Sequence, residues 1–283
     1  MSGSNKERRR NMKKFKRGMA FVLTLCMIFS IFTNVSVAQA ATKKNVAKTV
    51  TVKTQEELEK ALKDGKATKI KIVTSKKINL VIPKGKKTAG IQLVVNAPKA
   101  TIVNKATFKK ISITGSGAKS YTESGKNNVL VVSADSAKVT VAKNASVKTL
   151  TMDGAKATVV VNSGSKVAKV VVTEDQCNVS LKVNGTVSAV KVTGDASKIS
   201  ISGKASDTPV TVTGDQASVS ASTSVKLDIQ SDAKITLKDG AEGSSVKASD
   251  DVAIKVDNKT EEKITVSTPS GKTEDGKSFS GIG

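Results

Sequence analysis

The residues best placed for chemistry are three aspartates that recur every twenty residues, Asp175, Asp195 and Asp215. If each repeat forms one coil of stacked strands, neighbouring carboxylates lie about 5 Å apart. A row of carboxylates could hold Ca²⁺, which prefers several oxygen ligands. Two carboxylates two coils apart also approach the spacing of an inverting glycosidase pair. The same three residues are therefore candidates for a metal site or for catalysis.

A structural role explains the same pattern and is favoured. Each aspartate follows Thr-Gly or Thr-Glu, and Asp and Gly are common turn residues because the Asp side chain accepts hydrogen bonds from nearby backbone N–H groups. Ala155 interrupts the column, and no Gly-Gly-x-Gly-x-Asp repeat is present. The sequence thus predicts turn aspartates, with a Ca²⁺ site at Asp175, Asp195 and Asp215 as the open alternative and no other cofactor.

Composition restricts the possible chemistry. The chain contains no His and no Trp, so mechanisms that use histidine as acid, base or nucleophile are excluded. All the arginines lie in the first eighteen residues, at Arg8, Arg9, Arg10 and Arg17. The remainder therefore has no bidentate clamp for acidic sugars. Beyond residue 40 the aromatic residues are Tyr121, Phe108 and Phe279, too few for a sugar-stacking platform. A lysine base stays open, but no cluster of Lys and acid supports one.

The charge balance points to anionic partners. Without the eight basic residues and one acid of the first forty positions, 39 basic and 23 acidic residues remain, a net charge of +16. Many lysines occupy outward-looking alternate positions: Lys138, Lys148, Lys169, Lys182, Lys191 and Lys198. They could serve solubility and protect sheet edges, or bind anionic cell-wall polymers and acidic glycans by summed attraction. Nucleic acid fits poorly, because arginine and interleaved aromatics are missing.

Cysteine adds little to the functional prediction. Cys26 lies in the N-terminal apolar run, and Cys177 is the remaining one, so no internal disulfide is expected beyond residue 40. Cys177 stands among small residues at the same phase of the repeat, and no histidine is available to lower its pKa. We expect a buried, small, apolar side chain at a tight bend.

These residues are positioned by a repeat of twenty residues that runs from 129 to 222. Its apolar residues form four columns, which are Leu130, Leu150, Val170, Val190, Val210; Val132, Met152, Val172, Val192, Val212; Val139, Val159, Val179, Ile199, Val219; and Val141, Val161, Leu181, Ile201, Ala221. A fixed period of this size indicates a solenoid whose repeats bury their faces against their neighbours. A β-sandwich would vary its strand and loop lengths. Val and Ile suit stacked strands.

A short helix precedes the repeats. Thr54 can cap its N-terminus, and Glu57 three residues later completes a capping box. Leu58, Ala61 and Leu62 fall on one face, and Gly65 ends the helix. So short a helix is not stable alone. We expect its apolar face to cover the open end of the β-stack and to block pairing at that edge.

The segment Val52 to Leu62, followed by the strand Lys69-Ile70-Lys71-Ile72-Val73, resembles the start of pectate-lyase-like parallel β-helices. The pattern is also similar to secreted β-helical proteins of clostridia-type bacteria. The resemblance covers most of 51–266 and implies an all-β fold, a single-stranded right-handed parallel β-helix of about twenty residues per coil with an N-terminal capping helix. It also implies polysaccharide cleavage, usually with an Arg or Lys base and acidic Ca²⁺ ligands, which the composition does not support.

The N-terminal forty residues predict export. A basic stretch over 1–18, an apolar run from Met19 to Val37 and the Ala38-Gln39-Ala40 site are the three parts of a secretory signal peptide. An uncleaved membrane anchor is the alternative. The long basic stretch resembles those of Gram-positive bacteria. We expect a secreted or envelope-associated protein that leaves the membrane after cleavage.

The predicted organisation has four parts: a signal peptide over 1–40, a leader over 41–50, a parallel β-helix with its cap helix over 51–266, and a disordered tail over 267–283. Residues 114–128 are the least regular stretch and are expected to bulge out as a loop that carries Tyr121. The favoured function is a non-catalytic structural or surface-interaction role that involves adhesion to polyanions or glycans. The alternative is a divergent polysaccharide lyase or glycoside hydrolase.

Overall fold

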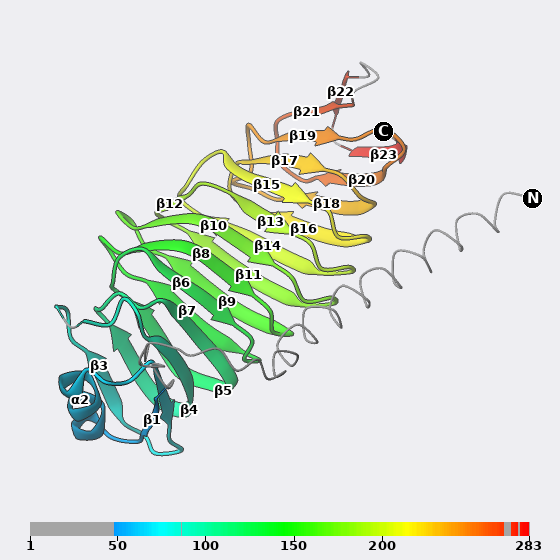
Figure 1. Cartoon of the computed structure of the whole chain (residues 1–283). Coiled ribbons are helices and arrows are strands. Elements are labelled where there is room, and N and C mark those ends of the chain that lie inside the picture. The colour runs from blue at the N-terminus through cyan, green and yellow to red at the C-terminus, as the bar shows by residue number, and fades with distance from the viewer. Residues whose placement is uncertain (1–47, 86, 269–272, 277, 283) are drawn as a thin grey trace, which may run out of the picture. The chain divides into compact units, whose positions relative to one another are not determined.

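The computed structural model describes residues 48–85, 87–268, 273–276 and 278–282. They form an all-β, right-handed parallel β-solenoid of about 11 turns, with about 20 residues per turn, which confirms the predicted fold class. The coils stack in chain order, so that the colours of Figure 1 run along the stack. Residues 1–40, the predicted signal peptide, and residues 41–47 of the predicted leader fall outside the described residues. Thr49 and Val50, which were assigned to the leader, already belong to the first strand.

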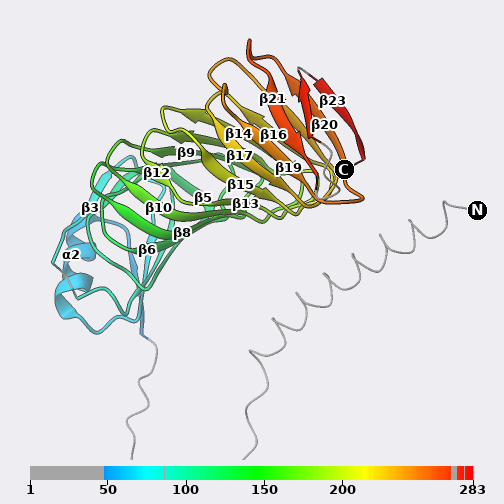
Figure 2. The ribbon, with the colours of Figure 1, turned by 90° about the horizontal axis from the view of Figure 1, so that it is seen from above.

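Each coil contributes a strand to two walls, which lie on opposite sides of the core (Figure 2). The first wall consists of β1 (Thr49–Val52), β2 (Lys69–Val73), the first half of β4 (Gln92–Asn104), the first half of β5 (Lys110–Glu123), β6 (Asn128–Val132), β8 (Ser146–Met152), β10 (Lys166–Val172), β12 (Thr186–Val187), β13 (Val190–Val192), β15 (Thr208–Val212), β17 (Val225–Ile229), β19 (Ser245–Ala248) and β21 (Ile264–Ser267). The second wall consists of β3 (Asn79–Ile82), the second halves of β4 and β5, β7 (Ala137–Val141), β9 (Lys156–Val161), β11 (Asn178–Val183), β14 (Lys198–Gly203), β16 (Ala217–Ala221), β18 (Ala233–Leu237) and β20 (Ala253–Asn258).

Two long strands pass from one wall to the other without a turn. β4 and β5 bend across the corner and contribute to both walls, with register shifts between them at the bend. The prediction of a loop over 114–128 is wrong for residues 118–123, which lie in β5, whereas Gly115 and Ser116 are exposed at the bend and residues 124–127 form a turn. Tyr121 is buried, with 1% of its surface exposed, and is not an exposed aromatic residue. The glycine- and serine-rich sequence of this segment suggested a loop, but β4 pairs with Ala118 and with residues 120–123, and β7 pairs with residues 121–123 on the other side.

The core lies between the walls and consists of alternate side chains of each strand. The two first-wall columns, from Leu130 to Val210 and from Val132 to Val212, stay in register at steps of twenty residues through all five copies. Their members are fully or almost fully buried. The sequence prediction for this wall is confirmed.

The second wall departs from the predicted register at one corner. Val159 lies beside Leu181, and Ala157 lies beside Val179, so this step is 22 residues instead of twenty. The corner at 173–177 is two residues longer than the corner at 153–155. Because strand side chains alternate with a period of two, the shift keeps every apolar residue on the inner face. The columns predicted for this wall are therefore inward-facing but misaligned by one pair across this step.

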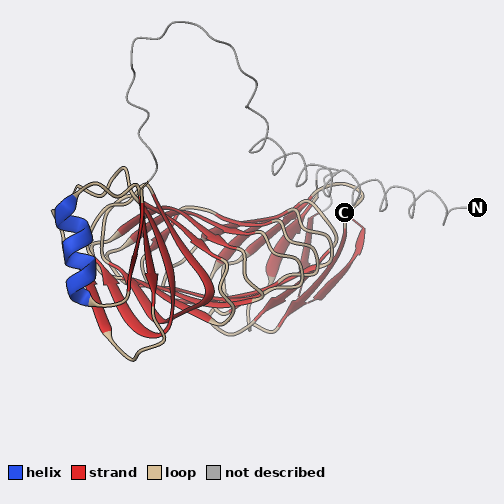
Figure 3. Ribbon diagram, turned by 60° about the horizontal axis from the view of Figure 1, so that its bottom comes forward, coloured by secondary structure: helices blue, strands red, loops and turns tan. Residues whose placement is uncertain are grey.

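Helix α2 (Gln55–Asp64) covers the N-terminal end of the core, beside β1 and β3 (Figure 3). As predicted, the Thr54 hydroxyl accepts a hydrogen bond from the Glu57 N–H (3.3 Å), Gly65 ends the helix at a φ of 61°, and Leu58, Ala61 and Leu62 are buried. The Glu57 carboxylate accepts from the N–H of Lys53. Within the described part of the chain, no helix is long and apolar enough to cross a membrane.

The cap also closes the exposed edge of the second wall. The Gln55 side chain donates to the carbonyl of Val81 and accepts from the Val81 N–H, both at 2.9 Å. Val81 lies in β3, the first strand of that wall. One side-chain amide thus replaces the backbone of a neighbouring strand, which confirms the expected protection of this edge.

The C-terminal end is closed by two strands that run against the others. β22 (Thr273–Gly276) pairs antiparallel with β21, and β23 (Ser278–Ile282) pairs antiparallel with β20. The prediction of a disordered tail over 267–283 is wrong for these residues. The unpaired backbone groups of the last coil offer hydrogen bonds to the following segment, whatever its side-chain composition.

Candidate functional site

The three predicted aspartates lie together at one corner of the solenoid, where the first wall turns into the second. The Asp195 N–H donates to Asp175 Oδ1 at 2.7 Å, and the Asp215 N–H donates to Asp195 Oδ1 at 2.8 Å. The same contact links Asp135 to Ala155 and Asp232 to Ala253. These side chains tie four pairs of neighbouring coils together as an interrupted ladder. We call this edge the aspartate corner (residues 133–136, 153–155, 173–177, 193–197, 213–216, 230–232 and 249–252).

The ladder depends on a recurring turn shape. The residue after each laddering aspartate from 135 to 215 has a left-handed backbone: Ser136, Gln176, Ala196 and Gln216 have φ between 53° and 58°. In the same turns, the hydroxyls of Thr173, Thr193 and Thr213 donate to carbonyls of the preceding coil. The backbone of each corner is therefore held by side chains of its neighbours.

This geometry supports the structural interpretation of the aspartates. Oδ1 of Asp175 and of Asp195 is occupied by a backbone donor, whereas a Ca²⁺ site requires several oxygens that converge on one point. Among residues 48–85 and 87–268, no group of three or more Asp, Glu, Cys or His side chains is arranged to hold a metal ion. The aspartates lie in a row, as predicted, and Asp175 and Asp195 accept hydrogen bonds from backbone N–H groups of the next coil.

Removal of one ladder side chain is expected to have a modest effect. Asp195→Ala loses the acceptor for the Asp215 N–H and should lower the free energy of unfolding by about 1 kcal/mol. Asp195→Asn keeps an Oδ1 acceptor at that position and should lose less. Urea unfolding with and without Ca²⁺ measures both effects. A Ca²⁺-dependent gain in stability that disappears in Asp195→Asn would restore the metal-site interpretation.

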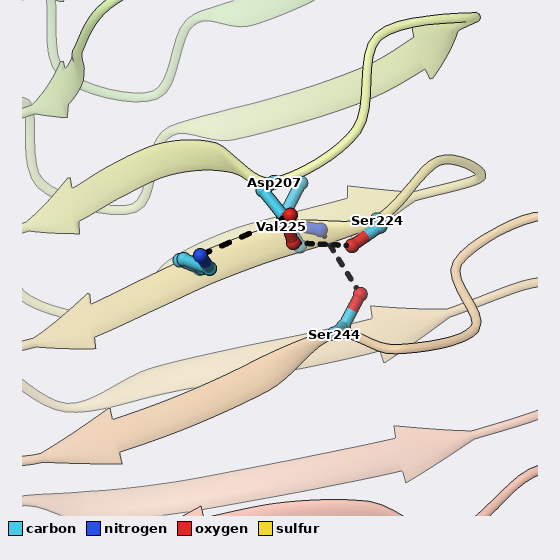
Figure 4. Close-up of polar contacts among 5 residues, drawn as sticks. Asp207, Ser224, Val225 and Ser244 are labelled. Carbon is cyan, nitrogen blue, oxygen red and sulfur yellow. Dashed lines mark hydrogen bonds and ion pairs between the residues drawn. The ribbon is translucent and has the colours of Figure 1, made fainter.

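The opposite corner, where the second wall returns to the first, uses other residues for the same purpose. We call it the return corner (residues 83–85, 87–91, 105–109, 124–127, 142–145, 162–165, 184–185, 204–207, 222–224, 238–244 and 259–263). The Ser224 hydroxyl donates to Asp207 Oδ1 at 3.1 Å, and the Val225 N–H donates to Ser244 Oγ at 3.0 Å (Figure 4). The Lys226 ammonium lies 3.8 Å from Asp207 Oδ2. Asp207 is thus part of a coil-to-coil contact in this region.

A buried polar network lies inside the return corner of the first coils, and sequence reasoning missed it. Glu123, at the end of β5, has none of its surface exposed. Its carboxylate accepts from Gly125 N–H (2.6 Å), Asn128 Nδ2 (2.9 Å), Tyr121 Oη (3.0 Å) and Asn104 Nδ2 (3.0 and 3.1 Å to the two oxygens). Four groups from three coils converge on one carboxylate.

The two asparagines extend the network to the corner backbone. Asn104 Nδ2 and Asn128 Nδ2 both donate to the carbonyl of Ala106, each at 2.9 Å. Asn104 Oδ1 accepts from the Ala106 N–H, and Asn128 Oδ1 accepts from the Phe108 N–H. Among the described residues, every buried side-chain polar atom has a partner. The network therefore fixes the turns at 105–108 and 124–127.

Burial governs the ionisation of this cluster. Desolvation raises the pKa of Glu123 above the ordinary carboxyl value, although hydrogen bonds from Asn104, Gly125, Tyr121 and Asn128 act in the opposite direction. Burial, together with the neighbouring Glu123 charge, raises the pKa of Tyr121 well above its ordinary value. Tyr121 is therefore a neutral donor.

A groove of about 670 Å³ lies directly outside this network. It is formed by consecutive turns of the return corner, and its lining residues are Lys84, Gly85, Lys87, Thr88, Ala89, Gly90, Lys105, Ala106, Thr107, Ser124, Gly125, Lys126 and Asn144. Four lysines and no acid are among them. Ala106 and Gly125 belong both to the groove and to the network, so the buried cluster supports the floor of the groove.

The outward lysines are placed as predicted, and the two corners differ in charge. Lys138, Lys148, Lys169, Lys182 and Lys198 are exposed, and Lys191 is half-buried. The aspartate corner, as defined above, contains acids and no lysine, whereas the return corner of the first coils (83–85, 87–91, 105–109, 124–127 and 142–145) contains lysines and no acid. The folded coil therefore separates charges that alternate along the sequence.

Cys177 has the environment that was predicted for it. It is fully buried at the bend before β11 and forms no disulfide. Burial raises the pKa of the Cys177 thiol. A buried neutral thiol of this kind is unreactive.

One signal in the sequence could have revealed the groove. Lys84, Lys105 and Lys126 are spaced by 21 residues, close to one coil, but outside the repeat that was read from 129 onward. Asn104 and Glu123 follow the inward residues Ile102 and Tyr121 at a distance of two, which is the spacing of a continuing inner face. Comparison of the chain with protein-family models, with curated proteins and with solved structures finds no match.

Proposed function

We propose that this protein is a secreted or cell-envelope β-helix protein of non-catalytic function, which adheres to anionic cell-wall polymers or acidic glycans. The observation that carries the proposal is the groove at the return corner, where Lys84, Lys87, Lys105 and Lys126 gather without an acid. Exposed lysines on both walls extend the positive surface around it. Summed attraction of many lysines favours an extended polyanion over a single small anion.

The fold supports an adhesive role in a second way. The walls are parallel sheets whose corners are tied by side-chain hydrogen bonds, so the exposed lysines are held on a stack whose successive coils lie about 4.8 Å apart. A polymer with regular negative charges can therefore contact several coils at once without ordering the protein first.

Binding to an anionic polymer is expected to depend strongly on salt. The chain from Ala41 onward, which contains the whole solenoid, should bind an immobilised acidic polymer at about 0.01 M salt, where charges interact over about 30 Å, and release it at about 1 M, where the range is about 3 Å. Surface plasmon resonance at increasing salt measures this directly. Affinity that does not change with salt would contradict an electrostatic mechanism.

The alternative of a divergent polysaccharide lyase or glycoside hydrolase predicts a different result. Incubation of acidic polysaccharides with the chain and Ca²⁺ would then release reducing or unsaturated ends. The aspartates best placed for such chemistry accept backbone hydrogen bonds. Product release that Asp195→Asn abolishes would replace the adhesive proposal with the enzymatic one.

We also propose that the chain is a distant relative of the pectate-lyase-like β-helix proteins, in particular of the secreted β-helical proteins of clostridia-type bacteria. Support comes from the capping helix, the parallel coils and the apolar columns. The basic and apolar segments of residues 1–37, followed by Ala38-Gln39-Ala40, support export from a Gram-positive cell.

A further inference from the structure

The groove has the properties of a defined site as well as those of a charged surface. Its volume of about 670 Å³ lies within the range of pockets that hold small ligands or one segment of a polymer. Its lining comes from four successive turns: 84–85 with 87–90, 105–107, 124–126 and Asn144. A ligand in the groove would therefore contact four coils at once.

The turns around the groove are tied to one another by their own side chains. The Thr88 hydroxyl donates to the Thr107 carbonyl (2.5 Å), and the Thr107 hydroxyl donates to the Lys126 carbonyl (3.0 Å). The Lys126 ammonium donates to the carbonyl of Asn144. These contacts fix the lining before any ligand arrives, which lowers the entropic cost of binding.

The floor is fixed from the inside by the buried network. Glu123 accepts from the Gly125 N–H, and the carbonyl of Ala106 accepts from Asn104 and Asn128. Gly125 and Ala106 line the groove. Support of this kind, in which buried hydrogen bonds hold the backbone of a pocket, is what keeps a binding site in one geometry.

The cations of the groove indicate the chemistry of its ligand. Lys84, Lys87 and Lys105 are exposed and line the same groove from two coils. An ammonium is a compact charge with three rotatable donors, which suits phosphate oxygens. The guanidinium group, which holds carboxylates and phosphates by paired hydrogen bonds, is absent beyond Arg17, so the groove acts through point charges, as lysine does with phosphate groups.

We propose that the groove is a specific binding site for a phosphate-bearing polymer, one or two of whose phosphate groups lie between Lys84, Lys87 and Lys105. This inference rests on the proposed function and narrows it to one site and one ligand chemistry. The remaining lysines then add general attraction, and the groove supplies the close contacts.

The test compares two triple variants with equal changes in charge. Lys84→Gln, Lys87→Gln and Lys105→Gln remove the groove cations, and Lys126 is left intact because it holds Asn144. The control variant carries Lys182→Gln, Lys198→Gln and Lys234→Gln, three exposed lysines of the second wall. Titration calorimetry with sodium polyphosphate of defined length measures affinity, and circular dichroism checks that each variant is folded.

The groove variant should lose about fivefold in affinity for each contacting lysine, on the order of 100-fold in all, and the control should lose only a few-fold. Equal losses of affinity in both variants would show that the groove is not a specific binding site, and would leave the proposal of general adhesion unchanged. No binding of the unaltered chain at low salt to polyphosphate or to polygalacturonate would instead overturn the proposed function itself. Polygalacturonate of matched charge provides the test of the phosphate assignment. If it binds as tightly as polyphosphate, and the groove variant loses as much affinity for it, the phosphate assignment is overturned.

Discussion

Replacement of Glu123 by alanine is expected to lower the free energy of unfolding by about 4 kcal/mol. The change leaves the donors of Asn104, Asn128 and Gly125 without their acceptor in a site that excludes water. It also opens a cavity between β5 and its neighbours, which adds a cost because the surrounding strands cannot collapse fully. Thermal and urea unfolding measure the loss.

The control is Glu174→Ala, which removes an exposed carboxylate at the aspartate corner and should change stability by no more than about 0.5 kcal/mol. Equal losses in the two variants would contradict a central role for the buried network. Glu123→Gln should lie between them, because the amide keeps one acceptor oxygen and places an NH₂ group where the network supplies donors.

The pH dependence of this variant tests the ionisation of Glu123. Because burial raises the folded-state pKa above the ordinary value of 4.5, the folded chain holds more protons than the unfolded chain between those two values. The proton-linked part of the contribution of Glu123 to stability is therefore complete below about pH 4.5 and is lost as the pH rises through the raised pKa, while its packing and hydrogen bonds remain. The gap in stability between the unaltered chain and Glu123→Gln should narrow over that interval. A gap that widens would show a lowered pKa.

Gly214→Ala is expected to cost about 3 kcal/mol, through a direct backbone collision. A Cβ atom at Gly214 would lie 2.1 Å from the carbonyl oxygen of Gly194 in the coil below. The atoms that it meets belong to backbone, so no side chain can rotate out of the way. Urea unfolding reports the loss, and fluorescence of an apolar dye reports any opening of the coil.

Gly90→Ala is the matched control, since a Cβ atom there meets nothing within 4 Å and the backbone is not left-handed. It should be neutral or slightly stabilising. If Gly214→Ala were equally neutral, the coils at the aspartate corner would have to be less tightly stacked than the structure shows.

The regular part of the fold could be predicted from the sequence because stacked coils repeat the same environment. Leu130 and Val132 begin columns that the structure keeps at twenty residues per step. The sequence pattern did not reveal the two extra residues in the step between Val159 and Leu181. Val, Leu and Ile at a spacing of two satisfy the pattern in either register, so the pattern determines the face of a strand and leaves its partner undetermined.

Prediction of the irregular part of the fold from the sequence failed where tertiary contacts override local conformational preference. Residues 114–123 are rich in Gly, Ser and Lys, which favour turns, but only Gly115 and Gly117 at the bend are left-handed, and Ala118 and residues 120–123 pair with β4 and, from Tyr121 onward, also with β7. Glu123 and Asn104 were missed because a polar residue at an inward position is read as the end of a strand. Lys84 and Lys105 were not grouped, because their distance depends on the lengths of turns that the sequence does not reveal.

The different closures of the two ends bear on how such a chain can change in length over evolution. Gln55 binds the backbone of Val81, and β22 and β23 pair with β21 and β20 through backbone groups. Neither closure depends on which coil it meets. A tandem duplication or deletion of one whole coil in the gene would therefore lengthen or shorten the stack by about 4.8 Å. Both end closures would still form. The number of coils, and with it the length of the solenoid, can therefore change in evolution without a change in the residues that close either end.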